Sequence, residues 1–176
     1  MTDVINIPRI VSLLIVAMMM AACVTDRNDE PESDWQLEVG DRVPQFQIAM
    51  SNGDVVSTSD LAGKTSLIVL FNTGCPDCRV ELPVLQQVYD FILTNNLDIP
   101  FLCIAREENE PDIASCWNTL GYTMPYSPQP DRAVFNLFAG SGIPRIYIVG
   151  SDLRLSAVFG PEACPDFASL LQALDL

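Results

Sequence analysis

The fold is decided by twelve residues, Asn72-Thr73-Gly74-Cys75-Pro76-Asp77-Cys78-Arg79-Val80-Glu81-Leu82-Pro83. They follow an apolar run, 66–71, that reads as a buried strand, and they lead into a long segment with helical spacing. Cys75 and Cys78 lie three positions apart where the strand gives way to the helix. Thiols at this spacing lie on one side of a helix, within reach of a disulfide bond. The stretch therefore predicts a site for reversible disulfide chemistry.

Composition excludes several classes of function. The chain has 176 residues, about half of them apolar, a length that favours about one domain. Its formal charge is −14 and Lys64 is its single lysine, which argues against binding to nucleic acid or to anionic lipid by charge. The absence of histidine excludes histidine bases, Cys-His nucleophile pairs and histidine metal ligands. Cysteines, carboxylates and backbone groups remain for chemistry.

The first 22 residues have the pattern of a targeting signal. An apolar run of eleven residues, 10–20, has the length of a signal-peptide core and is too short for a typical membrane span. Ala21-Ala22-Cys23 follows it and resembles the lipobox of bacterial lipoproteins. That resemblance implies cleavage before Cys23, which then carries acyl chains as a membrane anchor. A plain secretory signal with an incidental cysteine is the alternative.

An acidic segment follows the signal. Residues 23–37 hold five carboxylates against the single cation Arg27 and have little to bury, which predicts a solvated tether. The folded domain is then expected at 38–176. By resemblance to lipoproteins, the chain would be anchored in the cell envelope and face the periplasm. Val24, where a retention aspartate would hold many lipoproteins at the inner membrane, gives a mild preference for the outer membrane.

The remaining pattern predicts an α/β fold with a central mixed β-sheet flanked by helices. An Asn-Gly turn at 52–53 between two short strand candidates predicts an N-terminal β-hairpin extension. A helix at 132–138, capped by Asp131, and a terminal helix at 164–174 are also expected. The other predicted elements are strands at 66–71, 100–105, 144–149 and 155–159 and helices at 76–95 and 112–120.

Four groups of residues carry a resemblance to a known family. They are Val39-Gly40-Asp41 with Pro44-Gln45-Phe46, Leu61-Ala62-Gly63-Lys64, Cys75-Pro76-Asp77-Cys78 with Glu81 and Pro83, and Gly142-Ile143-Pro144-Arg145. In this order they resemble the thioredoxin superfamily, more narrowly the membrane-tethered extracytoplasmic thiol-disulfide oxidoreductases of the TlpA/ResA type, with an AhpC/TSA-like N-terminal extension. The resemblance covers about 39–176 and implies a thioredoxin-like fold. Two departures are Gly74, where the family usually has tryptophan, and a Pro76-Asp77 pair that does not end in proline.

The two cysteines have distinct expected roles. Cys75 would lie at the helix start, where unpaired N–H groups and the helix dipole stabilise a thiolate, so we expect it to attack the substrate disulfide. Cys78 would then resolve the mixed disulfide. A purely structural disulfide and half of a zinc site remain alternatives. Zinc needs about four ligands, and no second Cys-x-x-Cys or histidine is present, so we expect no metal.

Further site residues follow from position and resemblance. Glu81, three residues after Cys78, would face the same side of the helix, and by resemblance it handles the proton of Cys78; a solvated surface carboxylate is the alternative. Asp77 would oppose the helix dipole. The resemblance also implies that Pro144 is cis and faces the cysteine pair, that Ile143 offers its backbone to an extended substrate, and that Pro76 and Asp77 shape the contact surface.

The remaining cysteines of the predicted domain lie outside the Cys75–Cys78 pair. Cys103 lies in an apolar strand and is expected in the core. A bridge between Cys116 and Cys164 is left open, because an exported chain meets an oxidising compartment.

The resemblance favours a reductase of protein disulfides, with oxidised proteins such as apocytochrome c as substrates and a membrane thiol protein as electron donor. No cofactor is expected beyond the redox-active Cys75–Cys78 pair. Two alternatives are a thiol-dependent peroxidase and a copper-binding or copper-delivery module. The peroxidase is disfavoured because Asn72 stands where those enzymes place threonine. The copper module is disfavoured because its relatives use Cys-x-x-x-Cys plus histidine.

Overall fold

A computed structural model describes residues 35–176. The predicted signal peptide 1–22, the lipidation site Cys23 and the tether as far as residue 34 lie outside the described residues. In the described part, no helix is both long and apolar enough to cross a membrane.

The centre of the fold is a five-stranded mixed sheet with the strand order β5-β4-β3-β6-β7. β3 is parallel to β4 and antiparallel to β6, and the bounds are β3 Ser66–Phe71, β4 Phe101–Ala105, β5 Tyr126–Ser127, β6 Arg145–Val149 and β7 Leu155–Phe159. Every residue of β3 is buried, as the uninterrupted apolar run predicted for a central strand. The sheet confirms the α/β class and the mixed topology.

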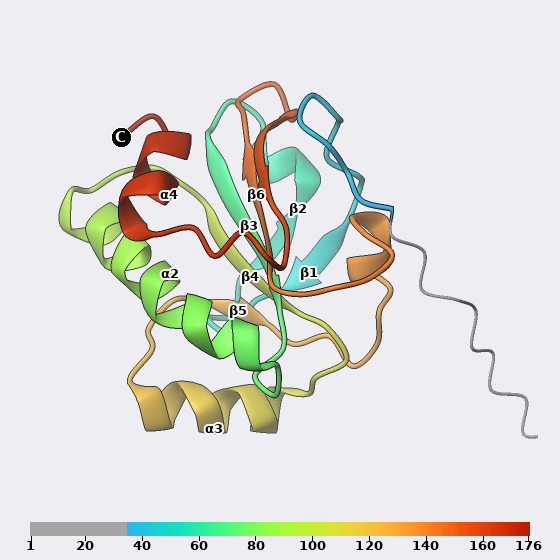
Figure 1. Ribbon diagram of the computed structural model, residues 1–176, viewed down its shortest axis with the longest axis vertical. Helices are drawn as coiled ribbons and strands as arrows, with labels where there is room; N and C mark the ends of the chain where they lie inside the picture. Colours follow the sequence, from blue (N-terminus) through green and yellow to red (C-terminus); the bar gives the residue numbers. More distant parts are fainter. Residues whose placement is uncertain (1–34) are drawn as a thin grey trace, which may run out of the picture. The chain divides into compact units, whose positions relative to one another are not determined.

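Helices cover the sheet. Figure 1 shows α2 (Pro76–Thr94) and α4 (Phe167–Ala173) together on one side of it. The rings of Phe91 and Phe167 meet edge to face at 5.9 Å between α2 and α4. α3 (Glu110–Leu120) packs through Trp117, whose ring lies 5.2 Å from that of Phe71 at the end of β3. The second contact places α3 beside the end of β3, the point from which the chain turns into α2.

The N-terminal hairpin lies on the other side of the sheet from α2 and α4 (Figure 1). β1 (Gln47–Ala49) and β2 (Val55–Ser57) are antiparallel, and a short 3-10 helix, η1 (Thr58–Leu61), follows. The turn between them contains Gly53 at φ +91°, a conformation that glycine adopts without strain. The buried hydroxyl of Thr58 accepts from the Phe46 N–H and donates to a nearby carbonyl, which ties the hairpin to the domain.

Three predicted helices differ from the structure by two residues or more, and the smallest difference is that of α3, which begins at residue 110 where the sequence predicted 112. The segment 132–138 forms only one 3-10 turn, η2 (Phe135–Leu137), because Asp131 caps just the local N–H of Ala133 and the segment is too short to bury a full helix face. α4 begins at residue 167, three residues later than predicted. Pro165 disfavours helical geometry in the residue before it, and Asp166 caps α4 by accepting from the Ser169 N–H.

Candidate active site

Cys75 is the N-cap residue of α2, in the turn that follows β3. Pro76 occupies the first helical position, where a missing N–H costs no hydrogen bond. Asn72 builds the turn: its carbonyl accepts from the Cys75 N–H at 3.1 Å and its side-chain oxygen accepts from the Gly74 N–H at 2.8 Å. The first cysteine is therefore half-buried at the helix start, as predicted.

Thr73, two residues before Cys75, is held by hydrogen bonds through its N–H, its hydroxyl and its carbonyl. Its N–H donates to the Glu108 carboxylate at 2.8 Å, and its hydroxyl donates to the other oxygen of the same carboxylate. Its carbonyl accepts from Arg79 Nε at 2.7 Å. Glu108 is buried and precedes α3, so this contact joins the turn before α2 to the turn before α3.

The second loop of the site comes from β6. Because β6 runs antiparallel to β3 and Arg145 pairs with Leu70, residues 143 and 144 lie beside the end of β3. The Ile143–Pro144 peptide bond is cis, as the resemblance implied. The thiol of Cys75 donates to the Ile143 carbonyl, with Sγ and O 3.6 Å apart. The structure thus brings together three residues that the sequence placed at one site.

Cys78 lies one turn further along α2 and is fully buried. Burial raises the pKa of its thiol far above the usual value, because a buried thiolate loses its hydration. A hydrogen bond with the backbone of Asn72 and the positive charge of Arg106 lower that pKa, and neither outweighs the desolvation. Cys75 and Cys78 are both free thiols in the structure, so it shows the dithiol form. As a thiol, Cys78 needs a base before it can attack.

Glu81 is buried one turn beyond Cys78, with 2% of its surface exposed. Its Oε1 has no hydrogen-bond partner among the described residues. Burial raises the pKa of this carboxyl from 4.5 to about 7. The solvated-surface alternative is therefore wrong: Glu81 is a buried group that changes charge near neutral pH. Asp77 and Pro76, by contrast, are exposed at the start of α2.

Comparison with known proteins agrees with this geometry. The family model described as Redoxin matches residues 38–171. The chain belongs to the Redoxin family. Curated relatives include the thiol-disulfide oxidoreductase ResA of Oceanobacillus iheyensis, 24% identical over 78% of this chain and 71% of that protein. The ResA of Bacillus subtilis strain 168 is 22% identical over 68% of this chain and 65% of that protein. The chain thus spans about two thirds of the length of these relatives.

Solved structures share the thioredoxin-like fold. A thiol:disulfide interchange protein of the thioredoxin family from Chlorobium tepidum has a TM-score of 0.65 at 22% identity, covering 79% of this chain and 97% of that chain. A DsbF homologue from Corynebacterium diphtheriae has a TM-score of 0.64 at 19% identity, covering 84% and 94%. The thioredoxin-like fold is confirmed. With the ResA relatives, the family match shows that this Redoxin-family chain is a thiol-disulfide oxidoreductase.

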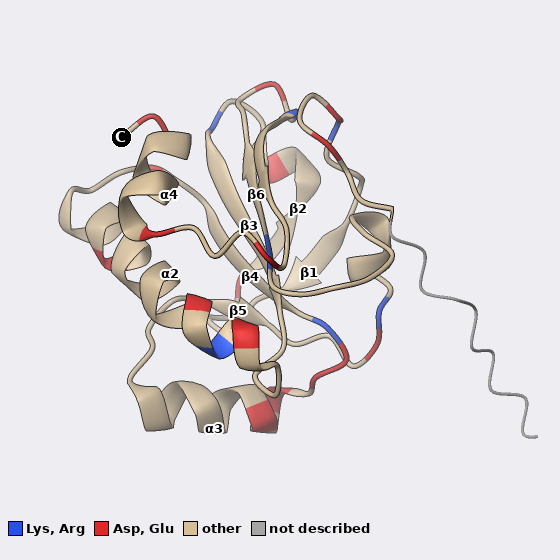
Figure 2. Cartoon of the chain, viewed as in Figure 1, with Lys and Arg blue, Asp and Glu red and all other residues tan. Residues whose placement is uncertain are grey.

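Sequence reasoning missed two polar residues at this Redoxin-family site. Glu108 follows β4 in an acidic run and gave no sign that it would be buried. Arg145 is 5% exposed and binds the loop before Pro144: its Nε and one terminal nitrogen donate to the Ser141 carbonyl, and Nε also donates to the Gly142 carbonyl. An arginine inside an otherwise apolar strand was the one available signal. Figure 2 shows the charges at the starts of α2 and α3.

Arg145 also reaches the N-terminal end of the described chain. Its remaining terminal nitrogen donates to the side chain of Gln36. Leu37 N–H donates to the Phe138 carbonyl at 2.9 Å, and Gly140 N–H donates to the Trp35 carbonyl at 2.9 Å. Residues 35–37, which the sequence assigned to the tether, therefore pair with the segment that leads into the Ile143–Pro144 loop.

A hollow of about 660 Å³ opens beside the turn before Cys75. Gly74 lines the hollow. The TlpA/ResA-type proteins that the chain resembles usually have tryptophan at this position, and glycine leaves the space open here. Most of the remaining wall comes from charged and polar side chains on or before α2 and α3, among them Arg79, Glu108, Asp112 and Cys116. The active-site surface is therefore recessed on this side.

The remaining cysteines take no part in the dithiol. Cys103 is fully buried in β4, as expected of a core residue. Cys116 and Cys164 are both free thiols in the structure, as Cys75 and Cys78 are, and a bridge between them stays a prediction. Within residues 35–176, no group of three Cys, Asp or Glu side chains is placed to hold a metal ion.

Proposed function

We propose that the chain is a lipid-anchored reductase of protein disulfides that acts outside the cytoplasm through Cys75 and Cys78. The observation that carries the proposal is the contact between Cys75 Sγ and the Ile143 carbonyl, 3.6 Å away, beside a cis proline. A carbonyl this close to the sulfur can accept a backbone N–H from an extended substrate segment and hold the substrate disulfide against Cys75.

The reaction transfers two electrons from the dithiol to the substrate. The Cys75 thiolate attacks one sulfur of the substrate disulfide, forms a mixed disulfide, and releases the other sulfur as a thiolate that takes up a proton. Cys78 then loses its proton and attacks Sγ of Cys75. This step forms the Cys75–Cys78 disulfide and releases the second substrate thiol. No cofactor beyond the two sulfurs enters the balance.

Glu81 is the base for the second step. Cys78 is buried as a thiol, and Glu81 is the buried carboxylate three residues away on the same face of α2. Its pKa of about 7 leaves it ionised in part of the population at neutral pH, able to accept the proton. Partial ionisation also limits the cost of holding a charge in the core.

The substrate-contact surface consists of Ile143 and Pro144 on one loop and Pro76 and Asp77 at the exposed start of α2. Asp77 lies in the first turn of α2, where its negative charge offsets the positive end of the helix dipole and opposes a second negative charge on Cys75. This opposition favours a reductant over a strong oxidant. Thioredoxin-fold potentials run from about −270 to −120 mV, and we expect this pair nearer the reducing end.

The anchor and the compartment follow from the leader sequence. Apolar residues 10–20 followed by Ala21-Ala22-Cys23 support export and acylation of Cys23, with the domain facing the periplasm and the outer membrane preferred. Oxidised proteins, among them apocytochrome c, would be substrates, and a membrane thiol protein would reduce the resulting disulfide. Cys23→Ser should abolish labelling by radioactive palmitate and partition into the detergent phase.

Trapping tests the thiol mechanism. Cys78→Ala should accumulate mixed disulfides on Cys75 in cells, visible as dithiothreitol-sensitive bands on gels, whereas Cys75→Ser should accumulate none. Purified wild-type domain should accelerate insulin reduction by dithiothreitol and consume hydrogen peroxide no faster than Cys75→Ser. Wild-type peroxide consumption well above that control, without trapped proteins, would favour the peroxidase alternative instead.

A further inference from the structure

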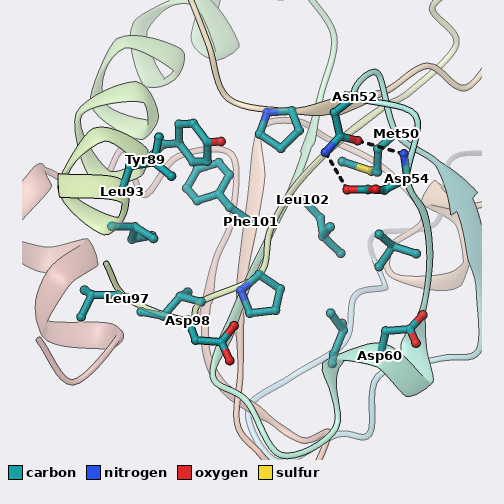
Figure 3. Close-up of a pocket in the computed structure, with 16 residues that line it drawn as sticks. Met50, Asn52, Asp54, Asp60, Tyr89, Leu93, Leu97, Asp98, Phe101 and Leu102 are labelled. Carbon is teal, nitrogen blue, oxygen red and sulfur yellow. Dashed lines mark hydrogen bonds between the residues drawn. The ribbon is translucent and has the colours of Figure 1, made fainter. Parts of the chain in front are cut away.

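A second pocket lies at the opposite end of α2 from Cys75. It has a volume of about 350 Å³ and lies between the last turns of α2, the β1–β2 hairpin and the start of β4 (Figure 3). Pro76 and Leu93 are seventeen residues apart on one helix, so the two sites are separated by roughly 25 Å along the axis at about 1.5 Å per residue. The pocket is therefore separate from the dithiol.

The interior of this pocket is apolar. Tyr89 and Phe101 pack edge to face in its wall, with ring centres 5.3 Å apart. Leu93 lines it while keeping 55% of its surface exposed, so the apolar surface continues beyond the mouth. A recess lined mainly by apolar and aromatic side chains is typical of sites that bind an apolar group. The other apolar wall residues include Met50, Val56, Leu97, Ile99 and Leu102.

The rim is acidic. Asp54, Asp60 and Asp98 line the pocket, and all three carboxylates are exposed. Lys64 pairs with Asp98 at 2.8 Å, whereas Asp54 and Asp60 have no cationic partner within the described chain. Hydrogen bonds from Ser57 hold the pKa of Asp60 below its usual value, so this carboxylate is ionised at neutral pH.

This charge pattern selects the occupant. A second copy of this acidic chain or an anionic lipid surface would bring negative charge to a negative rim. A basic segment brings complementary charge, and an apolar side chain within it fills the interior. We propose that the pocket is a docking site for a partner protein, which inserts an apolar side chain flanked by lysine or arginine.

Docking here leaves the active site uncovered. A partner held at the far end of α2 keeps Cys75 and the Ile143–Pro144 loop open to a disulfide-bearing segment. The inference does not rest on the proposed function, because it concerns binding alone and its probes carry no cysteine.

A titration of the reduced protein tests the proposal. NMR spectra follow the backbone amide shifts of residues 35–176 as the probe is added. The probe is a capped hexapeptide of two lysines, leucine, phenylalanine and two lysines. Binding in the submillimolar range is expected, with shifts centred on the pocket. One control peptide replaces the lysines by glutamate, and another replaces leucine and phenylalanine by alanine; neither should bind at 2 mM.

Variants separate the apolar and charged contributions. Leu93→Arg should weaken binding at least tenfold, because it blocks the mouth and repels the flanking lysines. Asp54→Asn combined with Asp60→Asn, which removes the two rim carboxylates that have no cationic partner in the described chain, should weaken it about fivefold, the size expected for two exposed ion pairs. Asp152→Asn combined with Asp175→Asn, which alters exposed aspartates outside the pocket, should change it less than twofold.

Four results would overturn the proposal: no binding of the lysine peptide at 2 mM, equal binding of the glutamate peptide, shifts centred on Cys75, or a dimer that Leu93→Arg converts to monomer in sedimentation velocity. The last result would assign the pocket to self-association. Leu93→Arg should retain wild-type insulin reduction, and that assay reports on the dithiol independently. Failure of the docking proposal is thus distinguishable from failure of the proposed reductase function.

Discussion

Replacing Glu81 by glutamine removes the one buried carboxylate that follows the dithiol on α2 and keeps its shape. In the folded protein burial raises the pKa of Glu81 to about 7, whereas the ordinary value is 4.5. Between these pH values the folded chain keeps the proton and the unfolded chain releases it. The contribution of Glu81 to stability is therefore complete below pH 4.5 and is lost as the pH rises through about 7.

The magnitude follows from the width of this interval. Each pH unit corresponds to about 1.4 kcal/mol, and the shift from 4.5 to about 7 then amounts to about 3 kcal/mol. Glu81 is 2% exposed, so solvent screens little of this effect. Glu81→Gln has no proton to lose. It should match wild type near pH 4.5 and exceed its unfolding free energy by about 3 kcal/mol at pH 8.

Urea unfolding of the reduced protein at pH 4.5 and pH 8 measures this difference, with fluorescence of the buried Trp117 as the signal. Glu38→Gln, at an exposed position, is the matched control and should show no such pH-dependent gain. A Glu81→Gln difference that is the same at both pH values would refute the raised pKa.

The same variant tests the proton transfer. A positioned base typically contributes about 10²–10⁴-fold to a proton-transfer step, so Glu81→Gln should slow resolution of a Cys75 mixed disulfide at least a hundredfold. In wild type this rate should rise with pH through about 7, as Glu81 ionises, and the inflection should vanish in the variant. Unchanged resolution with an intact inflection would assign the proton to another acceptor.

Three further changes test the supports of the site. Glu108→Gln turns one of the two acceptors facing Thr73 into a donor, so insulin reduction should fall and urea unfolding should show a loss of about 1–3 kcal/mol; equal activity and stability would show that this contact is dispensable. Arg145→Lys loses the planar fork that holds two loop carbonyls, and KM for a disulfide peptide should rise severalfold with kcat nearly unchanged; a selective fall in kcat would contradict a positioning role. Leu85→Ala at a fully buried position of α2 should cost about 2–5 kcal/mol in unfolding free energy, with insulin reduction retained while the protein stays folded.

Local patterns predicted the elements whose sequence signal is strong. The uninterrupted apolar run predicted both ends of β3 correctly. A strand that is covered on both faces is apolar along its whole length, so its ends coincide with the ends of the apolar run. Spacing and the Cys75–Pro76 start predicted α2 within one residue of its end. The helix expected at 132–138 was wrong: the segment forms one 3-10 turn, in which Phe135 packs between the guanidinium carbons of Arg106 and Arg132, 4.9 and 5.0 Å from the centre of its ring. A helical pattern of seven residues carries no information about such long-range contacts.

The pairing of Cys75 with Cys78 and its place between a strand and a helix were determined by sequence alone, because both depend on neighbours along the chain. The tertiary structure decided which charged side chains are buried at the site and what they contact. Glu81 differs from an exposed helix carboxylate only through the core that β3 and α2 enclose around it, and desolvation there sets its pKa near neutral. Glu108 lies 33 positions after Cys75 in the sequence, and Arg145 lies 70 positions after it. Only the folded sheet brings their hydrogen bonds to the two loops of the site, the turn before Cys75 and the loop before Pro144.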